Sequence, residues 1–142
     1  MTRRRVDFTT PFGRRVARRL RQAEVVWLTT VDARNCPQPR PVWFDWDGAT
    51  VLILSQPDTG KLRHITRNPN VSLAFDTDEQ GDDVMVLLGR ATILKRLPAA
   101  TRMRRYLRKY RQGIKRLDAT PVEFLAEYSV PVLVRLTALR GF

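Results

Sequence analysis

The chain has 142 residues, which is enough for one domain with a substantial core and too few for two independent domains. Its one cysteine, Cys36, excludes an intrachain disulfide and a cysteine-based metal cluster, and its one histidine, His64, excludes Cys/His zinc sites and a Ser-His-Asp triad within one chain. The formal net charge is +12, and 16 of the 26 basic residues lie in segments 3–21 and 102–116. We therefore predict a single domain over residues 1–142, with no metal site and with an attraction for anions.

The same composition bears on location. The basic start of the chain is not followed by an apolar signal core, and no apolar run approaches the roughly 18 residues of a spanning helix. We expect a cytoplasmic protein with no membrane span.

Both basic segments are predicted to form amphipathic helices, because apolar residues recur at spacings of three and four. In the first segment these residues are Phe12, Val16, Leu20 and Ala23, and in the second they are Met103, Tyr106, Leu107, Tyr110 and Ile114. We expect the apolar stripes to face the core. The arginine faces either are solvated or attract an anion.

The rest of the chain is predicted to be mainly β-structure, with β-branched and apolar runs between turn-forming segments. The expected strands are 25–31, 40–46, 50–55, 71–76, 84–97 and 130–142. Residues 32–39 are turn-rich, the Asp-Gly pair at 47–48 predicts a tight hairpin, and Gly89 is expected to bend or bulge its strand. Short helices are expected at 61–68, before Pro69, and at 122–128.

These elements together predict the fold class. Strands that follow one another without long helical crossovers favour an antiparallel sheet, and closure into a barrel avoids exposed edges. We predict a mainly β, α+β fold: a six-stranded antiparallel split β-barrel with its helices placed mainly at the ends.

Residues 55–69, SQPDTGKLRHITRNP, hold a glycine-lysine pair at the start of a predicted helix. The segment lacks the glycines of a Walker-type loop. If Asp58 or Thr59 caps the helix, free N–H groups and the positive end of the helix dipole lie beside the Lys61 ammonium group, an arrangement that favours phosphate. A plain turn with an exposed lysine is the alternative that the local sequence leaves open.

The order of motifs over a longer stretch carries a resemblance. The segment PQPRPVWFDWDGATVLILSQPDTGKLRHITRNPNVSLAFD (37–76), followed by GDDVMVLLGRATI (81–93), resembles the split-barrel flavin and deazaflavin oxidoreductases of the pyridoxamine 5'-phosphate oxidase-like superfamily. It looks most like the branch that uses coenzyme F420, a deazaflavin. The C-terminal LVRLTALRGF lacks the Arg-x-His pair of the true pyridoxamine phosphate oxidases, so pyridoxamine oxidation is not expected.

The resemblance implies a set of cofactor-binding residues. The strand along the tricyclic ring would be Val42, Trp43 and Phe44. Leu54, Ser55 and Gln56 would lie at the ring–ribityl end of the cofactor. Thr59, Gly60 and Lys61 would hold its phosphate. Many relatives have a second basic residue near the position of Thr59, and its absence here leaves Arg63, His64 or a helix arginine as substitutes. Packing in the core or in an interface is the alternative role for Trp43 and Trp46.

The resemblance also implies a homodimer with the cofactor in a groove at the interface. Residues that one subunit would contribute to the other's site are Trp27, Tyr128 and Arg135.

Three planar cofactors suit such a barrel: coenzyme F420, FMN, or a haem that His64 alone would have to ligate. The arginine-rich helices suit the carboxylate tail of F420, because arginine and carboxylate form strong bidentate pairs. We expect an F420-dependent oxidoreductase that transfers a hydride between the coenzyme and a small electron-poor organic substrate, with FMN as the alternative cofactor.

No catalytic residue is assigned, because Ser55, Tyr128 or a water could each supply the compensating proton. A basic nucleic-acid-binding protein or a coenzyme carrier is the alternative from another class. Nucleic acid is the less favoured partner, because the aromatic residues lie apart from the arginine-rich segments and no known RNA-binding signature is present.

Overall fold

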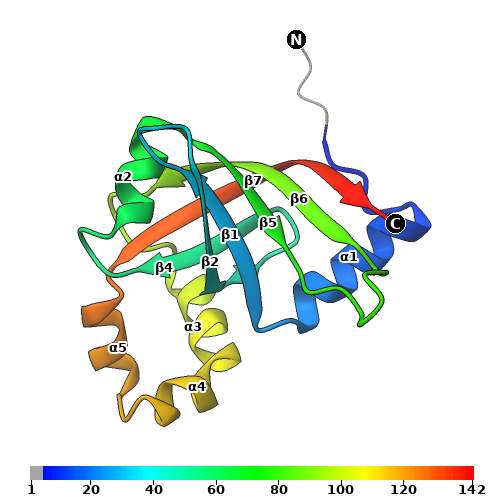
Figure 1. Ribbon diagram of the computed structural model, residues 1–142. Coiled ribbons are helices and arrows are strands. Elements are labelled where there is room, and N and C mark those ends of the chain that lie inside the picture. The colour runs from blue at the N-terminus through cyan, green and yellow to red at the C-terminus, as the bar shows by residue number, and fades with distance from the viewer. Residues whose placement is uncertain (1–4) are drawn as a thin grey trace.

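The computed structural model describes residues 5–142, and Arg3 and Arg4 of the first basic segment lie outside this range. Its seven strands form one antiparallel sheet in the order β2-β1-β5-β6-β7-β4-β3 (Figure 1). The strands are β1 (Val25–Val31), β2 (Pro37–Trp43), β3 (Asp45–Trp46), β4 (Thr50–Ser55), β5 (Asn70–Ala74), β6 (Met85–Ile93) and β7 (Val130–Gly141). The α+β class and the antiparallel sheet are confirmed.

The prediction of six strands was wrong, because the expected strand 40–46 is divided at Phe44. Its first part is β2, at one edge of the sheet, and its second part is β3, at the opposite edge. The two edges of the sheet therefore meet at this residue, because β2 ends at Trp43 and β3 begins at Asp45. Figure 1 shows the curl of the sheet that this requires.

Phe44 breaks the ladder because its backbone is hydrogen-bonded elsewhere. The hydroxyl of Tyr110 accepts from the Phe44 amide at 2.7 Å, and the Lys109 Nζ donates to the Phe44 carbonyl, also at 2.7 Å. Partners from a helix thus replace the ones that a neighbouring strand would supply.

Strand β2 and the bulge near Gly89 also bear on the predicted strands. β2 begins at Pro37, inside the stretch 32–39 that was expected to be loop. An edge strand tolerates the alternating prolines of this segment, because the N–H groups on its outer side form no hydrogen bonds with a neighbouring strand. The bulge expected near Gly89 is confirmed as a register shift between Leu88 and Gly89 in the β6–β7 pair.

The helices are α1 (Pro11–Gln22), α2 (Gly60–Arg67), α3 (Ala100–Lys109), α4 (Arg111–Arg116) and α5 (Pro121–Glu127). The single helix expected over 102–116 was wrong: it is broken at Tyr110, whose backbone leaves the helical region. The side chain of this residue is tied to Phe44, and the break lets α4 turn beneath the cleft described below. No helix among residues 5–142 has the length and apolar character needed to cross a membrane.

The core lies in two layers. The barrel interior is filled by side chains from every strand and from α1, and a second cluster lies between the outer face of β4 and helices α3 to α5. As predicted, Val42, Phe44 and Trp46 are buried on one face. Asp45, expected on the opposite face, is also buried, because α3 covers it.

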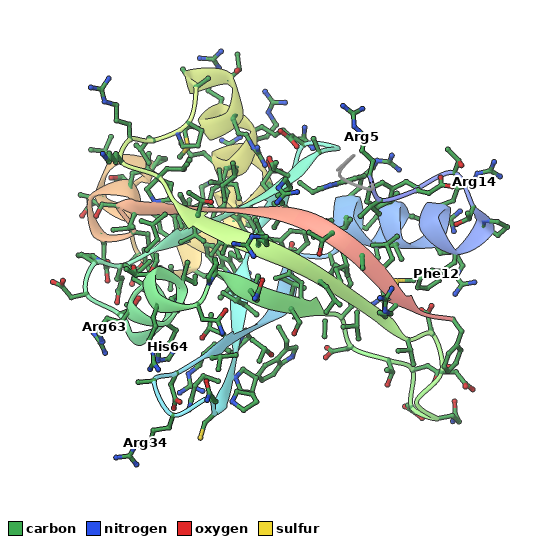
Figure 2. All side chains as sticks on the ribbon, turned by 90° about the horizontal axis from the view of Figure 1, so that it is seen from above. Arg5, Phe12, Arg14, Arg34, Arg63 and His64 are labelled. Carbon is green, nitrogen blue, oxygen red and sulfur yellow. The ribbon has the colours of Figure 1, made fainter. Side chains whose placement is uncertain are left out.

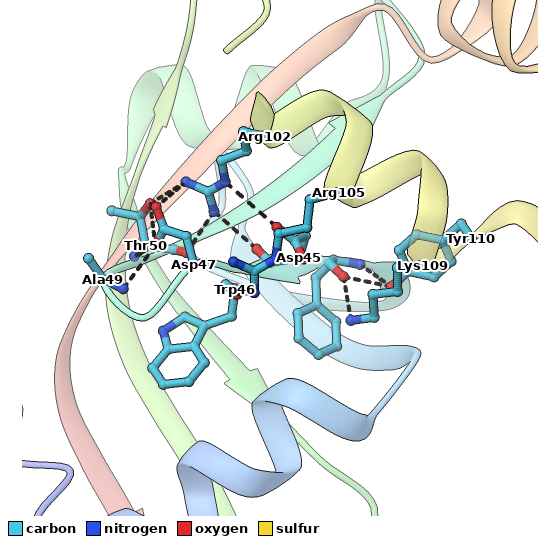
Figure 3. A network of polar contacts seen from close by, with 10 residues as sticks. Asp45, Trp46, Asp47, Ala49, Thr50, Arg102, Arg105, Lys109 and Tyr110 are labelled. Carbon is cyan, nitrogen blue, oxygen red and sulfur yellow. Dashed lines mark hydrogen bonds and ion pairs between the residues drawn. The ribbon is translucent and has the colours of Figure 1, made fainter. Parts of the chain in front are cut away.

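Two arginines of α3 anchor that helix to the β3–β4 hairpin (Figure 3). Arg102 donates to the Asp47 carboxylate at 2.8 Å and to the Thr50 carbonyl at 2.8 Å, and it lies 3.7 Å from the Asp45 carboxylate. Arg105 lies 3.4 Å from Asp45 and donates to the Trp46 carbonyl. The position of α3, which forms one wall of the cleft, is thereby fixed.

Candidate cofactor-binding cleft

A cleft of about 520 Å³ opens between β2, the end of β4 and helices α3 to α5. Six of the nine predicted cofactor-binding residues line it: Val42, Trp43, Leu54, Gln56, Thr59 and Lys61. Segments distant in sequence complete the wall with Val25, Pro41, Tyr106, Leu117, Phe124 and Tyr128. We refer to this space as the aromatic cleft.

Stacked rings form one side of the aromatic cleft. The Trp43 ring stacks on Tyr110, with centroids 4.5 Å apart and planes 2° apart, and it also stacks on Phe124, which in turn stacks on Tyr128. Offset stacks of this kind favour a planar apolar ligand alongside them. The close fit of Trp43 depends on Gly113 in α4, where an added Cβ would lie 2.8 Å from the indole.

Two predicted residues lie behind the wall. The Phe44 side chain is fully buried in the barrel interior against Phe75. Ser55 is also fully buried; its hydroxyl donates to the Gln56 carbonyl at 2.8 Å and lies 3.0 Å from the Thr59 hydroxyl. The Ser55 hydroxyl therefore orders the turn into α2 and does not face the cleft.

The polar end of the cleft is the first turn of α2. Thr59 occupies the N-cap position, as one of the two predicted alternatives had it, but its hydroxyl is engaged with Ser55 and makes no capping hydrogen bond. Asp58 instead adopts a left-handed backbone conformation, with φ of 61°. The amide groups at the start of this helix thus have no side-chain cap, and free amides at a helix start can donate to an anion.

Lys61 and Arg40 are close together at this end. Both line a pocket of about 350 Å³ that continues from the aromatic cleft and also includes Gly60 and His64. Burial lowers the pKa of Lys61, and the positive charge of Arg40 lowers it further. Neither cation forms an ion pair with a carboxylate within the described residues. We refer to this space as the Lys61–Arg40 pocket.

The second cation beside Lys61 is therefore Arg40, which was not among the residues predicted from the sequence. Arg63 donates to the Asp58 carbonyl at 2.8 Å and lines neither the cleft nor the Lys61–Arg40 pocket. His64 does line that pocket, and its Nδ1 lies 2.8 Å from the Thr30 hydroxyl. It does not line the aromatic cleft, so the residue that haem ligation would require is away from the stacked rings.

Helix α5 forms the outer wall of the cleft. The helix begins with a capping box between Thr120 and Glu123, a motif that the Thr-x-x-Glu sequence indicates. At its other end, Gln56 donates to the Glu127 carboxylate at 2.7 Å, which joins the end of α5 to the end of β4. Phe124 and Tyr128 are held over the cleft in consequence.

The lining residues that were not predicted differ in how strongly the sequence indicates them. Arg40 lies in the PRPVW stretch, and only pairing between strands and the curl of the sheet brings it to Lys61. The apolar stripe of α3 and α4 could have indicated Tyr106, but nothing local says that this stripe faces a cleft. Among the proposed partner-chain residues, Tyr128 lines the cleft of its own chain, whereas Trp27 and Arg135 do not.

Over residues 5–142, no three or more histidine, cysteine, aspartate or glutamate side chains are grouped as a metal ion would need.

Comparison with known proteins gives the family. The model of the family described as pyridoxamine 5'-phosphate oxidase matches residues 12–128. The chain belongs to the pyridoxamine 5'-phosphate oxidase family. No curated protein sequence matches this family member.

Solved structures share its fold. An F420 reductase is 23% identical with a TM-score of 0.65, over 85% of this chain and 92% of the other. A candidate pyridoxamine 5'-phosphate oxidase from Listeria innocua is 22% identical with a TM-score of 0.68, over 89% and 94%. The haem storage protein HutZ from Vibrio cholerae is 17% identical with a TM-score of 0.58, over 93% of each chain. At these identities the similarity concerns the fold alone.

Proposed function

We propose that this family member is an F420-dependent oxidoreductase, which transfers a hydride between the deazaflavin and a small electron-poor organic substrate. The observation that carries the proposal is the geometry of the site: a cleft walled by stacked aromatic rings ends at two adjacent cations that have no carboxylate partner among residues 5–142. A planar ring that bears an anionic chain suits such a site.

The described residues fit the coenzyme at both ends. The ring would lie against β2, along Val42 and Trp43, with Leu54 and Phe124 closing the apolar side. The phosphate would lie at the uncapped first turn of α2, near Lys61 and Arg40. There its charge would offset the burial and the repulsion from Arg40 that together lower the pKa of Lys61. When bound, the deazaflavin supplies a carbon centre that gives or takes a hydride.

The protein's own contribution is positioning and exclusion of water. The pair of Gln56 and Glu127 holds α5 over the opening, and the rings of α5 cover the space in which a substrate would meet the coenzyme. Such closure strengthens electrostatic interactions within the site. Neither of the two candidate side chains is assigned as the proton donor: the Ser55 hydroxyl faces away from the cleft, and Tyr128 is one of the wall residues of the cleft.

The test is a fluorescence titration of the purified protein with F420 and with FMN. We expect micromolar or tighter binding of F420 and weaker binding of FMN. Lys61→Ala should weaken F420 binding by about 10- to 100-fold, the worth of a charge-assisted hydrogen bond. Lys95→Ala, at an exposed lysine away from the cleft, is the matched control and should leave the affinity unchanged.

Several outcomes would contradict parts of the proposal. If the wild type binds neither coenzyme, the cofactor assignment fails. If Lys61→Ala binds F420 as the wild type does, the phosphate position is wrong. Tight binding without oxidation of the reduced coenzyme by any quinone or activated alkene would favour the coenzyme carrier, and binding only to duplex DNA with a steep salt dependence would favour the nucleic-acid alternative.

A further inference from the structure

A second depression, of about 430 Å³, lies between the β1–β2 loop and the outer face of α2. Three guanidinium groups and one imidazole line it, together with two residues of the loop: Asp32, Ala33, Arg34, Arg63, His64 and Arg67. Figure 2 shows Arg34, Arg63 and His64 at the same end of the molecule, opposite the end that carries Arg5 and Arg14. We refer to this space as the arginine pocket.

The three arginines of this pocket are not paired with carboxylates in the part of the chain that the structure describes. Of the ion pairs within residues 5–142, none involves Arg34, Arg63 or Arg67. Arg63 and Arg67 are four residues apart in α2, so like charges face each other on one side of the helix and destabilise it. The sequence of α2, GKLRHITR, contains no acidic residue that would offset them. A bound anion would relieve this repulsion.

Asp32 is the one carboxylate at the pocket, and it is already occupied. One of its oxygens accepts from the amides of Arg34 at 2.8 Å and Cys36 at 3.0 Å, and the other accepts from the Gln38 side chain at 3.1 Å. The amides of Cys36 and Arg34 lower the pKa of Asp32. This carboxylate therefore orders the loop that presents Arg34, and it does not pair with the arginines.

His64 connects this pocket to the site already described. Its ring lines both the arginine pocket and the Lys61–Arg40 pocket, and its Nδ1 is fixed by Thr30. The Lys61–Arg40 pocket in turn shares Pro41, Thr59 and Lys61 with the aromatic cleft. The three spaces thus follow one another: stacked rings, then two cations, then three arginines.

We propose that the arginine pocket is a second anion site, which binds a carboxylate or phosphate group at the far end of the ligand whose ring lies in the aromatic cleft. In this form the inference rests on the proposed function. A ligand with a single phosphate would be held at Lys61 and would leave the arginine pocket unused. A ligand with further acidic groups would reach it, and the planar guanidinium groups would bind those groups in bidentate pairs.

The experiment compares two ligands in two variants. The ligands are F420 with its oligoglutamate tail and the same ring compound truncated after the phosphate. The double variant Arg63→Gln/Arg67→Gln should bind the tailed coenzyme about 10- to 100-fold more weakly at low salt and the truncated one as the wild type does. Arg96→Gln, at another exposed arginine, should bind both ligands normally. Equal weakening for both ligands, or for neither, would overturn the inference.

A second measurement separates this inference from the proposed function. Thermal unfolding in inorganic pyrophosphate, which needs no ring site, should show stabilisation of the wild type that the double variant loses. If no ring compound binds but this difference is present, the proposed function fails while the anion site stands. If ring compounds bind but neither measurement distinguishes the double variant from the wild type, the arginine pocket is not an anion site. Both substituted residues are exposed, so the variant should fold.

Discussion

Lys109 is a half-buried amine in the layer beneath the barrel. Its Nζ donates to the Phe44 carbonyl at 2.7 Å and lies 3.8 Å from the centroid of the Phe44 ring. Burial lowers its pKa to about 8, against the opposing effect of the nearby carboxylates of Asp45 and Glu24. The charged form is therefore disfavoured in the folded protein relative to the unfolded chain, where a lysine titrates near 10.5.

This shift predicts a dependence of stability on pH. Between about pH 8 and pH 10 the unfolded chain binds more protons at Lys109 than the folded protein does, so the free energy of unfolding should rise with pH. Above about pH 10 it should fall, because burial raises the pKa values of Tyr106 and Tyr110 and they ionise more readily once unfolded. Urea denaturation at pH 7.5, 9.5 and 11 measures both changes.

The control for this prediction is Lys109→Met. It should reduce the rise between pH 7.5 and 9.5 and leave a remainder from Lys61, whose pKa is also lowered. A rise of the same size in Lys109→Met would show that another group is responsible.

At the same scale, the sequence predicted a site role for Lys61, which lines the cleft, and gave no indication of Arg40 beside it. The residues from Ser55 to Lys61 are contiguous, so a local motif could indicate them. Arg40 reaches Lys61 only through the pairing of β2 with β1 and the curl of the sheet. A local pattern contains no signal for such a neighbour.

Among the elements, α4 packs closely against the Trp43 ring of the cleft through Gly113. Gly113→Ala would place a methyl group 2.8 Å from the Trp43 ring, which is stacked against Tyr110 and Phe124 and cannot easily move. Overpacking of this kind costs about 1–3 kcal/mol, partly offset by the roughly 1 kcal/mol better helix propensity of alanine. We expect a net loss of stability and weaker coenzyme binding.

Gln112→Ala is the matched control, because this neighbour in α4 is exposed and gains the same kind of helix propensity without a clash. Denaturant unfolding and the tryptophan emission spectrum of the two variants provide the comparison. Unchanged emission and unchanged coenzyme affinity in Gly113→Ala would show that α4 does not set the position of Trp43.

Element boundaries were predicted well where periodicity and stop signals agree. Strand β1 and the helix before Pro69 are examples. Two of the errors, at Phe44 and at Tyr110, have one cause: the amide of Phe44 donates to the hydroxyl of Tyr110, 66 positions further along the chain. Each interrupts a locally regular pattern, and propensity is overridden by this tertiary contact.

At the scale of the whole molecule, the sheet presents an exposed apolar face. Trp27 is 41% exposed and Leu88 is 36% exposed. Trp27 pairs with Ala74, and Ala74 with Val86, so these residues share one face of the sheet. Val25, which is two positions before Trp27 on the same face, also lines the aromatic cleft. A second copy of the chain bound here would lie at the rim of that cleft.

We therefore expect a homodimer that forms through this face. Trp27→Glu should convert it to a monomer and weaken coenzyme binding, because burial of a charge opposes association. Val122→Glu, at an apolar residue that is 80% exposed on α5, should leave the dimer intact. Light scattering coupled to size exclusion measures the mass. A monomeric wild type, or a dimeric Trp27→Glu variant, would contradict the expectation.

The meeting of the two sheet edges at Phe44 has a consequence for how the chain folds. The contacts that hold this junction come from Lys109 and Tyr110, 65 and 66 residues further along the chain. Contacts at such separations form late, because a long loop must close before they contribute. Strand β7, which joins β6 to β4 in the sheet, also follows α3 in the chain, so an emerging chain that stops before α3 carries two unjoined sheets, β2-β1-β5-β6 and β4-β3, in place of a barrel.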